Sequence, residues 1–301
     1  MRHSRAKAFD DALGSAGRVC PARHWSEVAD DPIDPRALGY RSEQLRAAWR
    51  PDVADRVEFL IDRCRSKRVL DIGCVAHDVA RMASPQWLHA KIAGAASRCV
   101  GVDIHHAGIA EMLRLGYEAI AHDLTTGLGP VSDLGPFDVI VAGELIEHVG
   151  SMDMLFETAA GLLADDGELI VTTPNPWAPH RVRAAQLGHV WDNADHILFA
   201  FPGGMAELAD RHDLVLTEAA TTVVNPKIGS MTDGLKAVRR RWRGRQWMTV
   251  GFASLGDRRV ARVSYTRGGR MLHGMWWPRR QFLGETFIYV VRRPPTPLAL
   301  P

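Results

Sequence analysis

Three acidic residues of this chain stand where short apolar runs end, a pattern that suits a sugar-bearing ligand. Asp71 closes the run that begins at Val69, Asp103 closes the run that begins at Val100, and Asp123 follows a third run. If these runs are parallel strands, the three carboxylates meet in the crevice outside the carboxyl ends of the sheet, where ligands bind. For one Asp alone, capping a following helix is the simpler interpretation. Three acids in succession favour a site for a nucleoside, whose ribose hydroxyls a carboxylate can bind.

The loop after Asp71 indicates a nucleoside without phosphates. Gly73 permits a tight turn, but Val75 and His77 follow it in place of the glycine-rich loop that pyrophosphate prefers. The stretch Leu70-Asp71-Ile72-Gly73-Cys74 is similar to the first motif of the class I S-adenosylmethionine-dependent methyltransferases. This resemblance covers residues 65–225 and implies S-adenosylmethionine as the cofactor. The cofactor-binding residues that it implies are Asp71, Gly73, Cys74, Asp103, Ile104, Asp123, Leu124 and Gly143.

A second polar group follows the fourth apolar run. Glu144, Glu147 and His148 are spaced i, i+3 and i+4, so on a helical turn all three side chains point the same way. Two carboxylates and an imidazole can bind a divalent cation or provide a general base. We therefore expect these three residues to be catalytic, with His148 as the base if no cation is bound. The alternative is that an acid-His turn only orients the following helix.

The Glu-x-x-Glu-His pattern resembles that of ubiquinone-pathway O-methyltransferases and small-RNA 3′-terminal 2′-O-methyltransferases, in which it carries Mg²⁺. The RNA enzymes add a second His in a stretch similar to residues 193–199 of this chain, so His196 is a candidate ligand. The resemblance thus implies a Mg²⁺ site composed of Glu144, Glu147, His148 and His196. A cation beside a substrate hydroxyl lowers the pKa of that hydroxyl, which suits transfer to oxygen.

Apolar runs that alternate with helical patterns predict the elements that position these residues. Strands are predicted at residues 68–73, 98–103, 118–122, 137–142, 167–173, 214–224 and 285–291. Helices are predicted at residues 51–65, 107–115 and 151–163. This alternation is typical of a doubly wound α/β fold. The last two strands resemble the antiparallel pair that closes the seven-stranded, Rossmann-like methyltransferase sheet.

A basic segment separates those last two strands. Between Lys236 and Arg280 there are 13 Lys and Arg residues against one acid, whereas the rest of the chain has 24 basic and 34 acidic residues. Arg and Trp alternate there, and such a surface can bind phosphates, sugars, bases or anionic lipid headgroups. We therefore expect a lead-in at 1–50, a methyltransferase core at 51–225, a basic insertion at 226–283 and a last strand with its tail at 284–301.

Composition restricts where the protein works. The four cysteines show no paired spacing, which favours free thiols in a reducing compartment. The basic N-terminal residues are not followed by the apolar segment of a signal peptide, and no apolar run is long enough to span a bilayer. We expect a cytoplasmic protein that is peripheral at the membrane if residues 236–280 bind lipid headgroups.

These patterns together predict an S-adenosylmethionine-dependent methyltransferase that methylates a hydroxyl of a sugar, a lipid-linked compound or a secondary metabolite. Two alternatives stay open: an RNA ribose 2′-O-methyltransferase, and a non-catalytic protein that binds S-adenosylmethionine. The expected partner is a small-molecule, glycan or lipid-linked acceptor. Nucleic acid is a less favoured partner, because the chain outside the basic segment carries a net negative charge.

Overall fold

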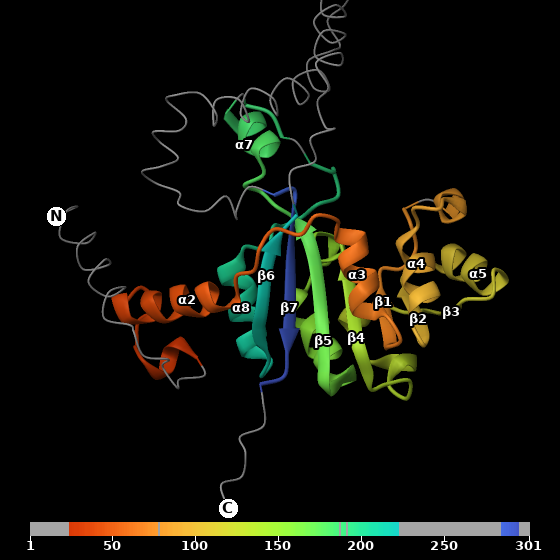
Figure 1. The fold of residues 1–301 in the computed structure, drawn as a ribbon, viewed down its shortest axis with the longest axis horizontal. Coiled ribbons are helices and arrows are strands. Elements are labelled where there is room, and N and C mark those ends of the chain that lie inside the picture. Colours follow the sequence, from red (N-terminus) through yellow and green to blue (C-terminus); the bar gives the residue numbers. More distant parts are fainter. Residues whose placement is uncertain (1–23, 78, 187, 191, 223–283, 295–301) are drawn as a thin grey trace, which may run out of the picture.

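Seven strands form one sheet, which is the predicted α/β architecture. The computed structural model describes residues 24–294 except 78, 187, 191 and 223–283. The strand order is β3-β2-β1-β4-β5-β7-β6, and β7 runs antiparallel to both of its neighbours (Figure 1). The strands are β1 (Arg68–Ile72), β2 (Arg98–Asp103), β3 (Glu118–Ala121), β4 (Phe137–Gly143), β5 (Leu163–Pro174), β6 (Val215–Thr221) and β7 (Thr286–Arg292).

The helices are more numerous than the sequence patterns predict. The α-helices are α2 (Pro35–Ala48), α3 (Arg56–Cys64), α4 (Leu88–Ala95), α5 (His106–Arg114), α6 (Met152–Leu162), α7 (Pro179–Gln186) and α8 (Pro202–Arg211). Short 3₁₀-helices are η1 (Trp25–Glu27), η2 (Val79–Ala83), η3 (Leu124–Thr126), η4 (Gly129–Val131) and η5 (Ile146–His148). No described helix combines the length and the apolar character needed to cross a membrane.

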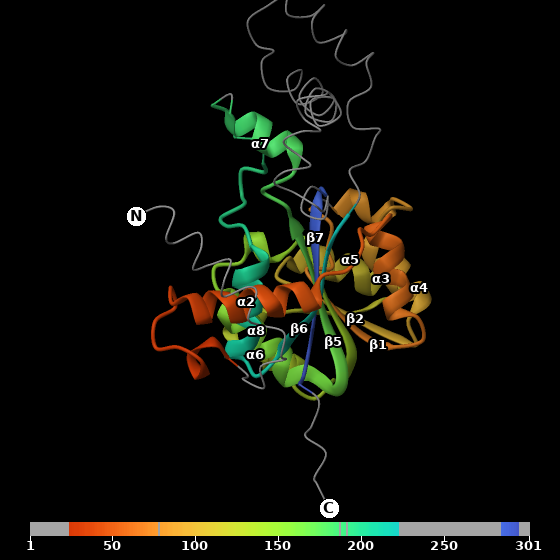
Figure 2. The same cartoon turned by 60° about the vertical axis from the view of Figure 1, so that its left-hand side comes forward.

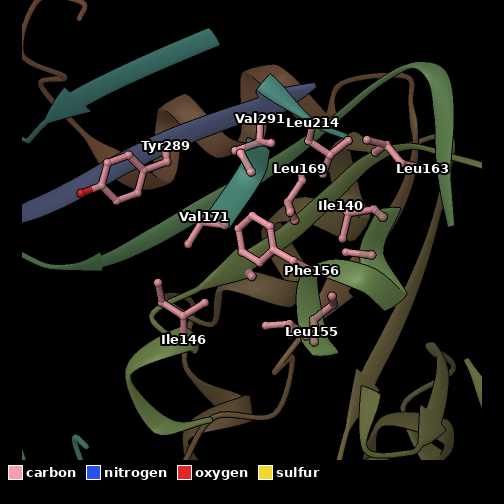
Figure 3. Packing of buried hydrophobic residues seen from close by; sticks show 14 of the residues in the cluster. Ile140, Ile146, Leu155, Phe156, Leu163, Leu169, Val171, Leu214, Tyr289 and Val291 are labelled. Carbon is pink, nitrogen blue, oxygen red and sulfur yellow. The ribbon is translucent and has the colours of Figure 1, made fainter. Parts of the chain in front are cut away.

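Alternate residues of each strand pack against different helices. Val139 and Val141 of β4 lie in a cluster with residues of α3 and α4. Their neighbour Ile140 lies in the cluster that contains α6 and α8, where Phe156 packs beside Leu169 of β5 (Figure 3). Burying one such side chain contributes about 1.5–3 kcal/mol. The central strands therefore need apolar residues on both faces, which is why their sequences are largely apolar.

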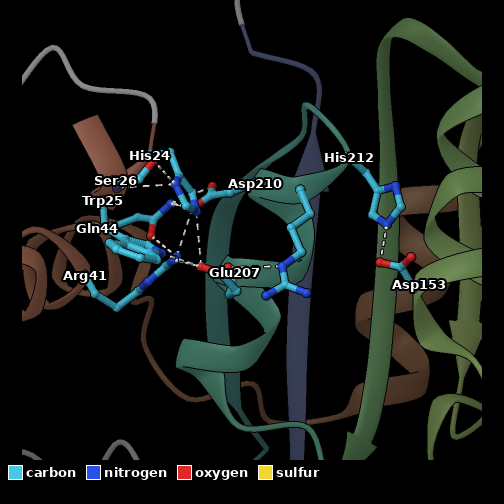
Figure 4. Close-up of polar contacts among 10 residues, drawn as sticks. His24, Trp25, Ser26, Arg41, Gln44, Asp153, Glu207, Asp210 and His212 are labelled. Atoms are coloured by element: carbon cyan, nitrogen blue, oxygen red, sulfur yellow. Dashed lines mark hydrogen bonds and ion pairs between the residues drawn. The ribbon is translucent and has the colours of Figure 1, made fainter. Parts of the chain in front are cut away.

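Helix α2 lies inside the segment expected to be a lead-in. The Asp34 side chain accepts a hydrogen bond from the Arg36 backbone N–H, and Pro35 occupies the first helical position. Arg41 contacts Glu207 at 2.6 Å and Asp210 at 2.9 Å, which fastens α2 to α8 (Figures 2 and 4). Ion pairs with the carboxylates of α8 therefore stabilise the position of α2, and no local sequence pattern predicts these contacts.

The chain after α2 covers the exposed edge of the sheet. The Arg50 backbone N–H donates to the Ala219 carbonyl of β6, and the Val53 N–H donates to the Thr221 carbonyl. Pairing of this kind protects an edge strand from association with another chain. The predicted basic insertion at 226–283 lies outside the described residues, and the division into domains stays a prediction.

Candidate active site

A cavity of about 860 Å³ opens at the carboxyl ends of β1, β2, β3 and β4. The eight residues predicted to bind the cofactor all line it, as do Glu144 and His148. Helix α7 stands beyond the same edge of the sheet (Figures 1 and 2). The fold thus gathers residues from four separate strand ends around one space.

Gly73 makes the turn that opens this cavity. Its φ of 74° is left-handed, a conformation that glycine adopts at no steric cost. A Cβ at this position would also lie 2.9 Å from the Leu145 side chain, in the loop after β4. The Gly73 N–H donates to the Val102 carbonyl at 2.8 Å, which ties the turn to β2.

Val75 occupies the position at which the family motif has its second glycine. A Cβ at Gly108, in the first turn of α5, would lie only 2.3 Å from Val75 Cγ1. The side chain of Val75 therefore packs against the bare backbone of α5. Because Gly108 has no side chain, α5 leaves room for the Val75 side chain. The loop after β1 can therefore carry a valine where the family motif has a glycine.

Asp103 and Asp123 organise the loops that they enter. The Asp103 carboxylate accepts hydrogen bonds from the Val75 and His105 backbone N–H groups, both at 2.9 Å. The Asp123 carboxylate accepts from the Thr125 N–H and caps η3. The capping interpretation is thus correct for Asp123, although both acids also line the cavity. Their expected contacts with ribose and adenine stay predictions.

Asp71 is buried beside His89, which lines the same cavity. His89 Nδ1 lies 2.8 Å from Asp71 Oδ2, and the two residues are 1% and 3% exposed. Trp87 packs on His89 and donates its indole N–H to the Cys74 carbonyl at 2.9 Å. Burial and the Asp71 and Asp103 charges raise the pKa of the Cys74 thiol far above its usual value, so Cys74 lines the cavity as a neutral thiol.

Arg56 is a functional candidate that the sequence patterns missed. It begins α3, and its guanidinium reaches across the cavity edge to donate to the Thr172 hydroxyl at 3.0 Å. The same Nη1 lies 3.8 Å from Glu144 Oε1. In the sequence, Arg56 is recognisable only as a basic residue at the start of the helix that precedes the first strand. That position alone does not predict its contact with the cavity.

Glu144 is separated from the other members of its motif. Its φ is 53°, and η5 begins only at Ile146, so the expected single helical turn over residues 144–148 is not formed. The Glu144 N–H donates to the Thr172 carbonyl at 2.8 Å, while its carboxylate faces Arg56. Glu144 is therefore not in the group that could hold a metal, contrary to the expectation from spacing.

Glu147, His148 and His196 do come together. Their candidate ligand atoms all lie within 4.8 Å of one another. The Ile197 backbone N–H donates to the Glu147 carbonyl, which brings the loop that carries His196 against η5. The His148 and His196 rings meet edge to face, with centroids 4.6 Å apart.

Glu147, the carboxylic acid of this group, lies in a strongly perturbing environment. It is fully buried, and the Thr173 hydroxyl donates to one of its carboxylate oxygens at 2.9 Å. The other oxygen, Oε1, has no hydrogen-bond partner among the described residues. Burial, and then the nearby charge of Glu144, raise the pKa of Glu147 to about 7.

Comparison with known proteins decides the family. A model described as a methyltransferase domain matches residues 42–219, which is more than half of the chain. The chain belongs to this methyltransferase family, within the class I S-adenosylmethionine-dependent enzymes. The family thus provides S-adenosylmethionine as the cofactor and agrees with the resemblance found in the first strand motif.

Individual relatives of this methyltransferase are distant. It is 27% identical to a ubiquinone biosynthesis O-methyltransferase of Caulobacter sp. (57% of this chain, 62% of that protein). It is 26% identical to a probable S-adenosylmethionine-dependent methyltransferase of Mycolicibacterium smegmatis (53% and 65%). The chain thus spans less than two thirds of these two curated relatives. A solved Archaeoglobus fulgidus methyltransferase aligns with 78% of this chain and 90% of its own, at 12% identity and a TM-score of 0.46.

The methyltransferase cavity fits the cofactor that the family uses. Carboxylates at the ends of β2 and β3 suit hydroxyl and amine donors, and the Arg56 guanidinium suits a carboxylate. The fit to Mg²⁺ is poor, because the gathered group has two imidazoles and one carboxylate whereas Mg²⁺ prefers oxygen ligands. Imidazole-rich sets suit cations such as Zn²⁺, Fe²⁺ or Co²⁺ better.

Proposed function

We propose that this methyltransferase transfers its methyl group to a hydroxyl oxygen of the acceptor. The observation that carries the proposal is the group of Glu147, His148 and His196 beside the cavity. A hydroxyl must lose its proton when its oxygen is methylated, and carboxylate and imidazole groups near neutral pKa accept protons efficiently. The name of the Caulobacter relative, an O-methyltransferase, supports the same choice.

The residues around the turn after β1 bind and orient the cofactor in this proposal. Asp103 binds the ribose hydroxyls, Asp123 binds the adenine amine, and Arg56 binds the carboxylate of the methionine end. Gly73 lines the cavity without a side chain, which allows the backbone of the turn to approach the cofactor closely. When bound, the cofactor supplies a methyl group on a positively charged sulfur.

The residues after β4 then handle the proton. His148 lines the cavity and is the proposed base, as the sequence pattern suggested. Glu147 lies behind it, and its pKa of about 7 allows it to hold or release a proton near neutrality. Rate acceleration otherwise comes from holding the acceptor oxygen in line with the methyl group. No step here requires Mg²⁺.

The acceptor class that we propose is a sugar, lipid-linked or secondary-metabolite hydroxyl. RNA ribose is the alternative acceptor, and a binding protein without turnover is the alternative function. The segment that would distinguish the acceptors, 236–280, lies outside the described residues. Peripheral membrane association through it, and a cytoplasmic location, are parts of the same proposal.

The experiment for methyl transfer follows the methyl carbon. Protein is incubated with S-adenosylmethionine labelled with ¹³C in its methyl group and with separated lipid, glycan and RNA fractions. The carbon chemical shift of the product distinguishes an O-methyl from an N-methyl or C-methyl group. An N-methyl or C-methyl product would overturn the proposal, as would calorimetry that shows no binding of S-adenosylmethionine or S-adenosylhomocysteine.

A second experiment tests the base. His148→Ala should abolish transfer, while a chelator should leave the wild-type rate unchanged. Loss of activity with the chelator, restored by added Mg²⁺, would contradict the metal-free arrangement. Salt-sensitive binding of an RNA oligonucleotide without binding to anionic liposomes would favour the RNA alternative.

A further inference from the structure

The loop over residues 192–197 supplies carboxylates that the Glu-x-x-Glu-His motif does not contain. Asp192 Oδ1 lies 2.6 Å from His196 Nδ1, and Asp195 Oδ2 lies 3.1 Å from His148 Nδ1. Each imidazole of the site therefore has its own acidic neighbour. Glu144, the acid expected from the motif, faces Arg56 instead.

The two acid-imidazole pairs differ in burial. The Asp192 and His196 side chains are 8% and 7% exposed, whereas the Asp195 side chain is 62% exposed. An exposed pair of this kind contributes little because water screens it. A buried pair acts through a lower effective dielectric, so its charge has a much larger effect on the ring. Asp192 is thus the carboxylate with influence over the site.

The neighbours of His196 define which ring nitrogen carries the proton. The Asn193 side-chain nitrogen, which can only donate, lies 3.2 Å from His196 Nε2, so Nε2 accepts. In the neutral ring the proton is then on Nδ1, which faces the carboxylate of Asp192. In this tautomer Nε2 carries the lone pair, and the Asn193 side chain donates to it.

The Asp192–His196 pair also contains buried polar atoms that form no hydrogen bond among the described residues. The 2.6 Å contact lacks hydrogen-bond geometry, and both His196 Nδ1 and Asp192 Oδ2 are buried without a hydrogen-bond partner among the described residues. Buried polar atoms are rarely left unpaired, so two in contacting residues indicate an arrangement that tightens when the site is loaded. Arg181 of α7, 3.7 Å from Asp192 Oδ1, holds the carboxylate in place.

We propose that Asp192, rather than Glu144, is the positioning carboxylate of the site, and that it keeps His196 protonated on Nδ1, so that Nε2 is the acceptor nitrogen of the ring. This proposal rests on the proposed function, in which His196 belongs to the working group. Carboxylates that orient an imidazole in this way fix both its tautomer and its direction. The loop that carries Asp192 is therefore part of the active site although it is distant in sequence from the motif.

The test follows the His196 tautomer directly. Protein labelled with ¹⁵N in histidine is studied by two-dimensional NMR at a pH at which the rings are neutral, with His196→Gln for assignment. Wild-type protein should show the Nδ1–H tautomer at His196. Asp192→Asn should produce a mixture, because an amide can donate to Nδ1 as well as accept from it, whereas Asp195→Asn and Glu144→Gln should leave the His196 signals unchanged. An Nε2–H ring in the wild type, or no change in Asp192→Asn, would overturn the proposal.

A second measurement uses Co²⁺ alone as the probe, because its visible spectrum reports its ligands. Asp192→Asn should weaken Co²⁺ binding by about 10- to 100-fold, the usual effect of losing a carboxylate that orients a ligand. Glu144→Gln should change binding by less than about threefold. An equal loss in Glu144→Gln would overturn the proposal. Calorimetry with S-adenosylhomocysteine reports folding of each variant and tests the proposed function separately.

Discussion

The two halves of the cavity satisfy their polar groups in opposite ways. Around β1, β2 and β3, Asp71 and Asp103 accept hydrogen bonds from residues distant in sequence, and Asp123 accepts one from Thr125. Beyond β4, buried atoms of Glu147 and Asp192 have no hydrogen-bond partner among the described residues. The three acids of the first half are thus paired before a ligand arrives, although His89 Nε2 beside Asp71 has no hydrogen-bond partner among the described residues. The acids of the second half keep oxygens that a ligand, a proton or a cation can use.

This difference in hydrogen bonding suits one half of the cavity to binding a cofactor and the other half to proton transfer. A cofactor pocket gains affinity when its loops are already ordered, because ordering then costs nothing at the moment of binding. A group that must accept a proton needs an unfilled position and a pKa near neutrality, and Glu147 has both. The predictions below test whether the two halves can be perturbed independently.

The largest expected effect concerns the unfilled half. Without added metal, Glu147→Gln should raise the free energy of unfolding at pH 8 by up to about 3 kcal/mol. The folded protein holds the Glu147 proton up to a pKa of about 7, whereas the unfolded chain releases it near the ordinary value of 4.5. Wild-type stability should therefore fall across this pH interval relative to the variant, and the gain should vanish below it. Urea unfolding at several pH values measures this, with exposed Glu157→Gln as the control.

A smaller loss is expected in the ordered half. Gly108→Ala should destabilise the protein by about 1–3 kcal/mol, because the new methyl group overlaps Val75 Cγ1 at 2.3 Å. Val75→Ala in the same chain should restore most of the loss, so the two changes should be strongly non-additive in a double-mutant cycle. Gly94→Ala in α4 has open space around it and should be neutral or stabilising. Additive losses would show that Val75 does not pack on α5.

Cofactor affinity should depend on Asp103, the last residue of β2. Asp103→Ala should weaken binding of S-adenosylmethionine at least tenfold, since a charge-assisted hydrogen bond contributes roughly 1.5–3 kcal/mol. Asp123→Ala should cost less, because Asp123 is exposed. Calorimetry on both variants gives the comparison. Unchanged affinity in Asp103→Ala would mean that the acid only orders the loops at Val75 and His105.

The smallest effect concerns Mg²⁺. Millimolar Mg²⁺ should leave the melting temperature of the protein unchanged, whereas Zn²⁺ or Co²⁺ should raise it, since a ligand that binds the folded state stabilises it. His196→Gln should remove the rise. Stabilisation by Mg²⁺ that survives in His196→Gln but is lost in Glu144→Gln would show that the acids bind the cation without the imidazoles.

The order of the central elements was predictable from the sequence. Strands β1, β2 and β4 are buried on both faces, so they need largely apolar sequences, and Asp71 and Asp103 stand near the carboxyl ends of β1 and β2, where the chain meets the cavity. The turn at Gly73 was also predictable, since only glycine tolerates its φ without strain. Helices α4 and α8 were not predicted, because contacts with the sheet rather than a local pattern define them.

The sequence by itself determined the sheet, the gathering of Asp71, Asp103 and Asp123 at one cavity, and the candidacy of Glu147, His148 and His196. Only the tertiary structure showed that Glu144 lies near Arg56 and apart from this group. It also showed that Val75 packs on Gly108 and that Asp192 contacts His196. Periodicity is a property of neighbouring residues, and it defines strands and helices well. Pairings between residues tens of positions apart depend on how loops from different strands meet, and no local spacing records that geometry.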